Sequence, residues 1–430
     1  MSEKIKKLLG AGFFDVFGAS LINNVINFLA GFILVRILSK SEYGLFTYVW
    51  NKYNLVMLLC GLGYESGFLQ LASEKSKDTE LVKKLYGYSS RIGAIFNIAV
   101  TALLVIIALF IPLKIKNSNG LLLMVAFLPS IQFIFRMMSV YLRSLKRNRD
   151  YAILTNINTL LIGFTTVAGA YVFREKGLIL AYYVSFALTI ILAIVIIKVP
   201  VYLNGTPEKD DAIQLRNISI ISLCNNALSQ LLYLFDVFVI GVVIANEEIL
   251  ATYKVATIIP TAMMFVPQSV IVFVYPYFAE HRLDKKWCIS NFKKLMVYFN
   301  LANIVITTML VAGAPIIIRL VHGAKYLDAV PAFRILSLSY FFSAGFKSIS
   351  GNLLVTQRKL KYNLFVSIMT GVVNIITDYI LVSYMGSIGA AYTTLAVVIL
   401  AGLLMTPYLL YSFNHIKEDA EDKLLEESKE

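Results

Sequence analysis

Long apolar runs recur along the whole chain and are separated only by short polar connectors. A helix that crosses the hydrocarbon core of a bilayer needs about 20 predominantly apolar residues. Lipid cannot satisfy free backbone N–H and C=O groups, so only helices and closed barrels span membranes. The composition agrees, because 58% of the residues are hydrophobic and only 15% are charged, against roughly 25% in soluble domains. We therefore expect an all-α integral membrane protein.

The apolar runs predict twelve transmembrane helices. The six of the first half cover residues 13–38, 43–72, 86–111, 119–143, 151–173 and 177–198, and the six of the second half cover 217–244, 249–279, 294–318, 327–355, 363–384 and 387–413. The longest connector runs from about residue 199 to 216. A segment of that length cannot bury a core of its own, which excludes a catalytic domain outside the membrane.

The positive charge of the chain follows a topological pattern. The formal net charge of +13 would suggest nucleic acid as a partner of a soluble protein, but here the basic residues cluster in connectors. With the amino terminus inside, the inner segments hold 25 Lys and Arg and the outer ones 7. The positive-inside rule then places both termini in the cytoplasm, including a charged tail at residues 416–430, and no nucleic-acid partner is expected.

An internal repeat divides the chain into two halves. Ser20–Asn24 (SLINN) recurs as Ser222–Asn226 (SLCNN), and three further matches follow in the same order. They pair Glu42, Leu45, Thr47 and Tyr48 with Glu247, Leu250, Thr252 and Tyr253; Arg147 and Tyr151 with Arg358 and Tyr362; and Ala181-Tyr182 with Ala391-Tyr392. Duplicated halves are typical of transporters. We predict six-helix lobes at residues 1–205 and 206–415, related by an axis along the membrane normal, around a central cleft.

The motifs of common enzymes are missing. The chain carries no GxxxxGK[ST] phosphate loop, no HExxH helix and no GxSxG nucleophile elbow. Its three histidines form no ligand cluster, and its three cysteines lack the spacings of zinc or disulfide frameworks. We therefore expect neither an enzyme nor a bound metal or cofactor, and any transport would be driven by a gradient rather than by ATP.

Charged residues inside the predicted helices are the remaining signal, because a charge within the bilayer is costly and usually marks a water-filled path or an internal pair. The basic ones are Arg36, Lys52, Arg91, Arg136, Lys254, Arg334 and Lys347. The acidic ones are Asp15, Glu65, Asp236 and Asp378. The basic excess favours an anionic substrate, since a cleft with low-dielectric walls concentrates the field of its charges.

The repeat relates some of these cations. An offset of 211 residues maps Arg136 onto Lys347, and an offset of 205 maps Lys52 to within about one turn of Lys254. We predict that all seven basic residues line a cationic cleft. The alternative for Arg36, Arg91 and Arg334, which lie near span ends, is that they reach out to the membrane interface. The alternative for the four deeper cations is a structural ion pair.

The acidic residues have two interpretations as well. Asp236 could pair with Lys254, and Glu65 with Arg91, because each pair lies at a similar distance from one membrane face. Otherwise Asp378, Asp236 and Glu65 are candidates for a proton-coupling group, and Asp378 is the best of them because it lies deep in its helix without a charged repeat mate. Helix 249–279 carries Pro260, Pro267 and Pro276, and the bends that prolines cause suit a gating element.

Two stretches of sequence carry a family resemblance. They are Arg36–Phe46 (RILSKSEYGLF) and Gly371–Tyr392, which contains GVVN and GSIGAAY. The chain resembles a bacterial O-antigen or polysaccharide repeat-unit flippase, from the polysaccharide transporter family of the multidrug, oligosaccharidyl-lipid and polysaccharide exporter superfamily. It ends after twelve helices, whereas related lipid II flippases usually carry fourteen. The resemblance covers the whole chain in length, helix count and halved organisation.

The resemblance implies a function. Members of that family move an undecaprenyl-pyrophosphate-linked oligosaccharide from the inner to the outer leaflet of the bacterial inner membrane by alternating access, for lipopolysaccharide biosynthesis. The implied partners are the lipid-linked oligosaccharide, membrane lipids, a proton as coupling ion, and the polysaccharide polymerase with its chain-length machinery. The alternative is a cation-coupled multidrug exporter of the same superfamily. A membrane-embedded polymerase would need a long outer loop rich in Arg or His, and the chain has none.

Overall fold

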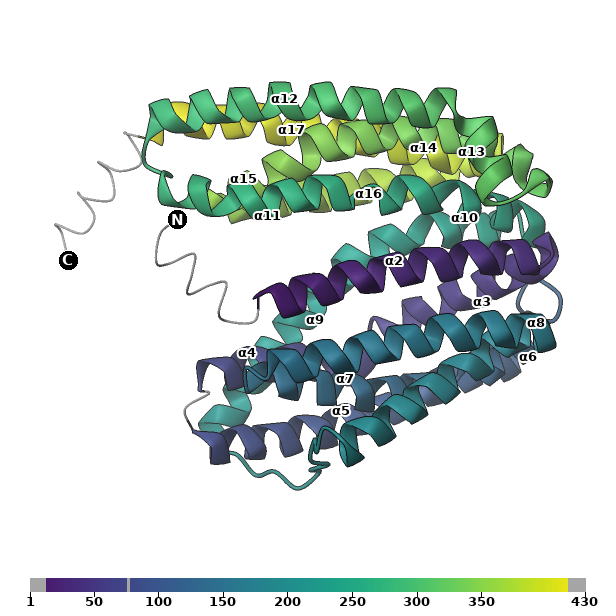
Figure 1. Cartoon of the computed structure of the whole chain (residues 1–430), viewed down its shortest axis with the longest axis vertical. Helices are drawn as coiled ribbons and strands as arrows, with labels where there is room; N and C mark the ends of the chain where they lie inside the picture. Colours follow the sequence, from purple (N-terminus) through teal and green to yellow (C-terminus); the bar gives the residue numbers. More distant parts are fainter. Residues whose placement is uncertain (1–12, 76–77, 417–430) are drawn as a thin grey trace. The chain divides into compact units, whose positions relative to one another are not determined.

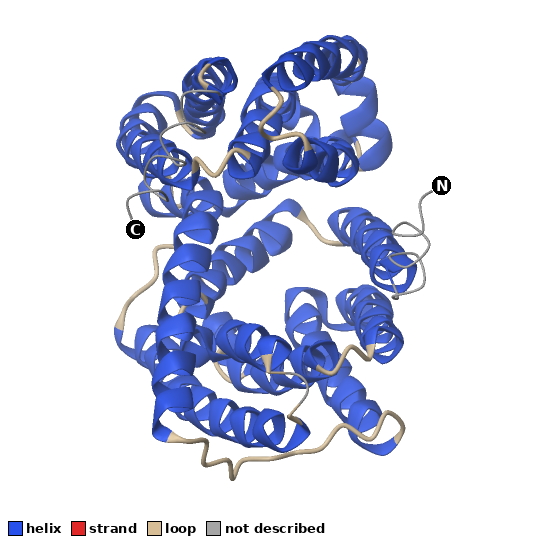
Figure 2. Cartoon of the chain, turned by 90° about the vertical axis from the view of Figure 1, so that its left-hand side faces the viewer, coloured by secondary structure: helices blue, strands red, loops and turns tan. Residues whose placement is uncertain are grey.

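The computed structural model describes residues 13–75 and 78–416, and for a few residues within the helices, among them Asp15, only the backbone. The lysines before residue 8 and the tail after residue 416 lie outside the described residues. Every regular element of the described ranges is a helix (Figure 2). The prediction of an all-helical membrane protein is confirmed for the fold class.

The chain divides into two compact units, Met1–Gly241 with Ala245–Glu248, and Val242–Ile244 with Ile249–Glu430. The first unit holds α2 (Phe13–Ile37), α3 (Lys40–Met57), η1 (Cys60–Gly63), α4 (Tyr64–Glu74), α5 (Thr79–Phe110), α6 (Ser118–Val125), α7 (Leu128–Ser144), α8 (Asn148–Val195) and α9 (Lys209–Val243). Most of α9 therefore belongs to this unit, whereas the sequence repeat begins the second half at residue 206.

After Val242–Ile244, the second unit holds α10 (Glu247–Ala262) without its first two residues. It continues with α11 (Phe265–Glu280), α12 (Lys285–Ala312), α13 (Ala314–Val321), η2 (Ala324–Ala329), α14 (Val330–Phe342), the π-helical turn η3 (Ser343–Ser348), α15 (Ile349–Thr356), α16 (Leu360–Met385) and α17 (Ser387–Asn414). In this unit α17 packs against α12, α14 and α16 (Figure 1).

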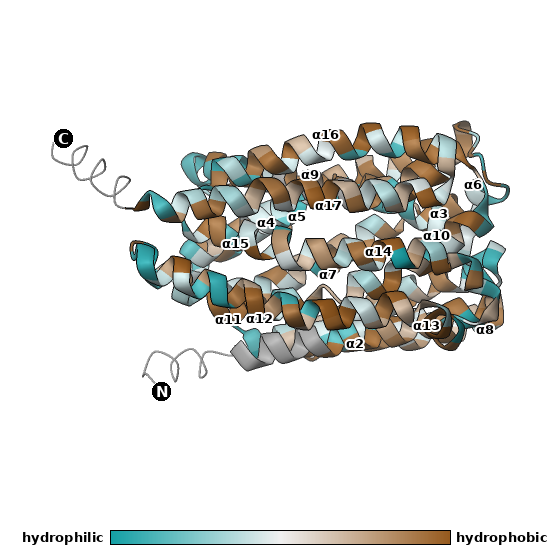
Figure 3. Cartoon of the chain, turned by 90° about the horizontal axis from the view of Figure 1, so that it is seen from above, coloured by the Kyte–Doolittle hydropathy of each residue, from teal (hydrophilic) through white to brown (hydrophobic). Residues whose placement is uncertain are grey.

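Many large apolar side chains lie on the surface of these helices. Phe110, Phe164 and Tyr384 are each at least 76% exposed. Figure 3 shows apolar residues along the middle of the helices and hydrophilic residues toward their ends. An aqueous solvent would penalise such surfaces, whereas acyl chains solvate them. The distribution is that of a membrane protein.

The number of membrane crossings stays a prediction. All twelve predicted ranges fall on helices. Among the described residues, however, eight helices are long and apolar enough to span a bilayer, or nine if the bent pair Lys40–Met57 and Cys60–Glu74 is one span. One of the eight is α8, whose 48 residues would extend about 72 Å if straight, at 1.5 Å per residue.

Helix α8 contains a hairpin, which explains part of the difference between the twelve predicted spans and the eight or nine long apolar helices of the described residues. The backbone at Arg174 has φ 54° and ψ −136°, which no helix adopts. Gly169 and Gly177 lie against each other across the turn, and a Cβ on Gly177 would sit 1.9 Å from the carbonyl oxygen of Gly169. Two helices therefore meet here, and they coincide with the predicted ranges 151–173 and 177–198.

The first of the two family-like stretches forms a helix cap. Ser39 precedes α3, and its Oγ accepts a hydrogen bond of 3.2 Å from the Glu42 N–H. A Glu42 carboxylate oxygen accepts one of 2.7 Å from the Ser39 N–H in return. This capping box satisfies two backbone donors that a helix start leaves open. Glu42 also lies 3.5 Å from Arg174, so the cap joins α3 to the α8 turn.

Candidate functional site

The second predicted span of the chain is broken. Helices α3 and α4 are bent by 42° across the short element η1. Three consecutive residues there have positive φ, with 58° at Gly61, 48° at Leu62 and 73° at Gly63. The two glycines adopt this backbone without a Cβ clash. Breaks of this kind in membrane helices free backbone polar groups, and they are tolerated where protein or water satisfies those groups.

Helices α5 and α7 hold the break from one side. The Asn97 Oδ1 atom of α5 accepts a hydrogen bond of 3.2 Å from the Gly61 N–H, and Asn97 is only 1% exposed. The Phe133 ring of α7 packs directly on Gly61 and Gly93. A Cβ atom on Gly61 would lie 2.4 Å from this ring, and a Cβ atom on Gly93 would lie 2.1 Å from it. The sequence thus places one buried amide at the donor that the break exposes, and one ring in the space that two glycines leave.

Helix α9 holds the break from another side. Gly63 and Gly67 are four residues apart and face Ser219, whose carbonyl oxygen and Oγ lie 2.3 Å and 2.1 Å from the places where their Cβ atoms would be. Glycines at this spacing let membrane helices approach closely. Seven residues further along α9, the Asn226 amide donates a hydrogen bond of 3.5 Å to the Ser66 Oγ.

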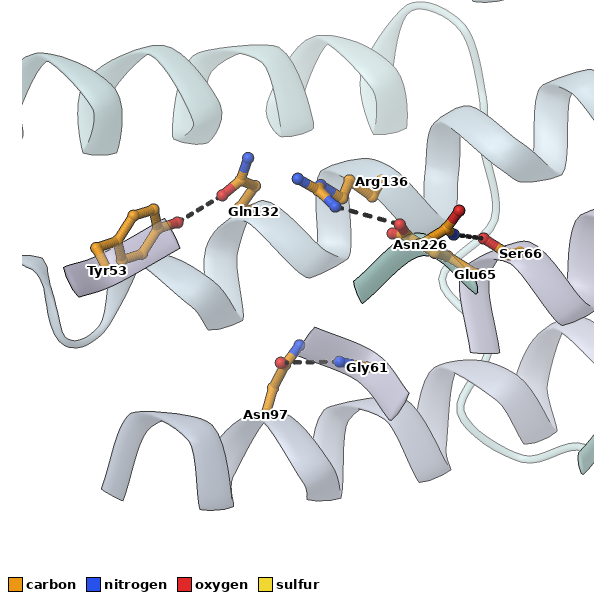
Figure 4. Close-up of polar contacts among 8 residues, drawn as sticks. All are labelled: Tyr53, Gly61, Glu65, Ser66, Asn97, Gln132, Arg136 and Asn226. Atoms are coloured by element: carbon orange, nitrogen blue, oxygen red, sulfur yellow. Dashed lines mark hydrogen bonds and ion pairs between the residues drawn. The ribbon is translucent and has the colours of Figure 1, made fainter. Parts of the chain in front are cut away.

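An ion pair lies within this cluster. The Arg136 Nη1 atom of α7 donates to the Glu65 Oε1 atom in the first turn of α4 at 3.2 Å (Figure 4). The Arg136 side chain is 40% exposed and that of Glu65 is 23% exposed, so neither is sealed in the core. The other carboxylate oxygen, Oε2, is buried and accepts no hydrogen bond from the described residues. Among the described residues, Arg136 is thus the hydrogen-bond partner of this carboxylate.

A second polar contact lies beside the ion pair. Gln132 precedes Arg136 by one helical turn on the same face of α7. Its Oε1 atom accepts a hydrogen bond of 2.5 Å from the Tyr53 hydroxyl of α3 (Figure 4). We define the polar cluster as the eight residues drawn in Figure 4: Tyr53, Gly61, Glu65, Ser66, Asn97, Gln132, Arg136 and Asn226. It joins α3, η1, α4, α5, α7 and α9 at the broken span.

Lys52 lies on α3, one residue before Tyr53, and is half-buried. Its Nζ atom lies 3.9 Å from the centre of the Phe238 ring of α9 and 4.9 Å from that of Tyr48. Two aromatic faces at these distances stabilise an ammonium group that no carboxylate of the described residues pairs with. A desolvated cation of this kind suits an anionic ligand, as the sequence predicts.

The three basic residues predicted near span ends contact aromatic rings or a backbone oxygen. Arg36 stacks on Phe32 of its own helix at 4.8 Å, and Arg91 lies 5.8 Å from the Tyr88 ring on the preceding turn. Arg334 is exposed and donates to a backbone oxygen of α12. The Glu65–Arg91 pair that the sequence suggested is not formed among the described residues, because Glu65 pairs with Arg136 instead.

In the second unit Lys347 lies in the π-helical turn η3, half-buried, and its ammonium group has no hydrogen bond or ion pair with the described residues. π-Turns inside α-helices frequently mark functional positions. Asp378 of α16 is fully buried. Lys254 of α10 and Asp236 of α9 are half-buried and belong to different units.

The sequence did not single out most residues of the polar cluster. Tyr53, Asn97 and Gln132 are neutral, and a search for charges inside spans passes over them. Two signals were present in the sequence. The pair Gly61 and Gly63 interrupts an apolar run, and Asn226 belongs to the repeated SLCNN segment. Among the described ranges, no group of three His, Cys, Asp or Glu side chains could hold a metal ion.

Solved structures share this fold. The lipid II flippase MurJ in an inward closed conformation is 16% identical, with a TM-score of 0.72, and the match covers 95% of this chain and 90% of that one. An inward-facing multidrug resistance MATE transporter of the MOP superfamily is 14% identical, with a TM-score of 0.66 and coverages of 92% and 96%. A MOP superfamily transporter from Pyrococcus furiosus, reported to have a binding pocket of reverse polarity, is 13% identical with a TM-score of 0.61. That match covers 94% of this chain and 96% of the transporter.

The fold is therefore shared with MOP superfamily membrane transporters and with a lipid II flippase. The sequence also matches a family model over residues 33–331. The chain belongs to the family described as polysaccharide biosynthesis protein. No curated protein matches it in sequence.

Proposed function

We propose that the protein moves an undecaprenyl-pyrophosphate-linked oligosaccharide repeat unit from the inner to the outer leaflet by alternating access. The family connects the chain with polysaccharide biosynthesis, and a flippase for lipid II shares its fold. The observation that carries the proposal is the partly exposed Arg136–Glu65 pair at a broken span. Charges inside spans are costly, and they usually mark a water-filled path or an internal pair. Arg136 and Glu65 form a pair, and their partial exposure is what favours a path beside it.

The pyrophosphate replaces Glu65 as the partner of Arg136 in this proposal. The guanidinium group carries five N–H donors, and the described structure engages one of them, on Glu65. Phosphate oxygens accept two parallel hydrogen bonds from arginine, which makes such pairs stronger than the single bond seen here. Arg136 stays neutralised before and after substrate arrives, so the cation is never left alone in a medium of low dielectric.

Lys52 and Lys347 are proposed to contact the same anion during transport. Lys52 is held between aromatic rings, and Lys347 is the repeat mate of Arg136. The other predicted cleft residues are secondary candidates: Arg36, Arg91, Lys254 and Arg334. Asp378 is proposed as the proton-coupling group because its side chain is fully buried in α16, with Asp236 and Glu65 as further candidates.

The proposal includes a place in the cell. The distribution of Lys and Arg favours a multi-pass protein with both termini in the cytoplasm. The family resemblance implies the bacterial inner membrane. The substrate would then be an O-antigen unit for lipopolysaccharide. A polymerase with its chain-length machinery would use the flipped unit in the outer leaflet.

Charge reversal tests the proposal in a strain that lacks the native protein. Arg136→Glu and Lys347→Glu should each abolish surface polysaccharide while the protein stays in the membrane at its normal level. Arg147→Glu with Asp150→Arg is the matched control, because this 2.7 Å pair lies in the connector end of α8, outside the polar cluster. Unchanged polysaccharide with both Arg136 and Lys347 reversed would contradict the proposal.

A cation-coupled multidrug exporter is the second candidate, and the MATE transporters with this fold favour it. Such a protein would recognise cationic compounds through acidic groups, and Glu65, Asp236 and Asp378 are acidic residues inside the predicted spans. A drug-susceptibility panel on the deletion strain separates the two functions. Hypersensitivity to several cationic drugs, with normal polysaccharide, would favour the exporter.

A further inference from the structure

The second unit carries a groove whose charged residue, Arg334, is only a secondary candidate for the proposed transport site. It lies between α12 and α14 and has a volume of about 510 Å³, within the range of roughly 300–1,000 Å³ typical of small-molecule sites. Its lining consists of five apolar side chains, two threonines and one charged residue. They are Ile304, Thr307, Thr308, Val311, Ala312, Leu338 and Phe341, and the charged one is Arg334.

The groove opens on an apolar surface. Ile304 on α12 is 49% exposed and Leu338 on α14 is 40% exposed. Arg334, Leu338 and Phe341 follow one another at the spacing of one helix face, so α14 presents a cation above two apolar side chains. A surface of this composition in a membrane protein meets acyl chains.

The Arg334 guanidinium is placed at the end of α12. Its Nε atom donates a hydrogen bond of 3.2 Å to the carbonyl oxygen of Val311, which lies in the last turn of that helix. Ile304 lies seven residues earlier, which is about two turns or 10 Å deeper along the axis. The groove thus has its cation where the span of α12 ends and its apolar lining further inside.

Arg334 has donors to spare. Of the five N–H groups of a guanidinium, the one on Nε has a partner, and no carboxylate of the described residues pairs with the side chain. The Thr308 side chain, about one turn below Val311, is exposed and has no hydrogen bond with the described residues. A cation and a hydroxyl at the mouth of an apolar groove match a phosphate group that carries a hydrocarbon chain.

We infer that the α12–α14 groove binds one anionic glycerophospholipid, with its phosphate on Arg334 and one acyl chain along Leu338, Phe341 and Ile304. The single positive charge matches the single negative charge of a phosphodiester. A lipid pyrophosphate carries more charge than one guanidinium neutralises, and the groove lining offers no second cation. Under the predicted topology the phospholipid belongs to the outer leaflet.

Native mass spectrometry of the full purified chain tests this site. The probes are palmitoyl-oleoyl phosphatidylglycerol, the matching phosphatidylcholine, undecaprenyl phosphate and inorganic phosphate. We expect one phosphatidylglycerol to bind selectively, and Arg334→Gln to weaken it about tenfold, as the loss of a charge-assisted phosphate contact does. Leu338→Trp should weaken it as well, because it fills the groove and leaves the charge intact.

Arg319→Gln is the matched control, since Arg319 is an exposed cation in the last turn of α13 that does not line the groove. Its lipid binding should equal that of the unchanged protein. Equal loss in Arg319→Gln and Arg334→Gln would overturn the inference, because a general surface charge would then explain binding. Stronger binding of undecaprenyl phosphate, or full competition by inorganic phosphate, would overturn the choice of ligand. None of these results depends on transport activity.

Discussion

Replacing Gly93 by alanine should loosen the packing that holds the broken span. The added Cβ would lie 2.1 Å from the Phe133 ring, which is itself only 2% exposed. Carbon atoms in contact are normally about 3.5 Å apart or more, so the ring or the helix must move by about 1.4 Å. Overpacking of a filled core costs about 1–3 kcal/mol. We therefore expect Gly93→Ala to lower the free energy of unfolding by that amount relative to its control.

The control is Gly120→Ala, because no atom lies within 4 Å of the position that its Cβ would occupy. Both glycines are helical, so the gain in helix propensity is common to the two variants. Unfolding titrations in mixed micelles measure the difference. Phe133→Leu should make the cost of Gly93→Ala smaller, with a coupling of about 0.5–3 kcal/mol between residues in contact. Equal stability of the two alanine variants, or additive effects of Gly93→Ala and Phe133→Leu, would refute the packing described here.

Three further predictions concern single side chains. Asn97→Leu leaves the Gly61 N–H without its acceptor, so stability in the same titration should fall by about 1–3 kcal/mol, whereas an unchanged value would mean that the break is held in another way. Lys347→Met should remove surface polysaccharide and Lys347→Arg should retain most of it, because the positive charge matters more than the shape of the side chain. Equal loss of polysaccharide in both variants would point to a packing role for η3. Asp378→Asn should abolish the dependence of transport on an imposed proton gradient in vesicles but leave substrate binding intact, and a variant that still responds to the gradient would exclude Asp378 as the coupling group.

The sequence predicted the fold class because the bilayer imposes a simple rule. Apolar runs of spanning length have to become helices in lipid, and the ranges found this way all fall on helices of the structure. Even the two ranges 151–173 and 177–198 were separated correctly, although α8 continues as one element through the turn at Arg174. Composition decides this level of structure, so a single sequence is sufficient for it.

The pairing of charged residues could not be predicted in the same way. Depth alone offered a Glu65–Arg91 pair as one interpretation, but in the structure Arg136 lies beside Glu65 instead. The π-helical turn that carries Lys347 also leaves no mark in the hydropathy pattern. Helix α9 shows the same limit, because hydropathy gives no sign that Ser219 lies against Gly63 and Gly67. Such features depend on side-chain packing between distant segments.

Flipping of a purified lipid-linked oligosaccharide in proteoliposomes tests the central claim most directly. The substrate carries a fluorophore on its sugar, and a membrane-impermeant quencher reports the fraction that reaches the other leaflet. We predict flipping by the unchanged protein, loss in Arg136→Ala, and retention in the Arg147→Ala control. A lipid-linked oligosaccharide with a neutral linkage in place of the pyrophosphate should not be moved. Transport of that neutral lipid at the same rate, or full activity of Arg136→Ala, would contradict the account.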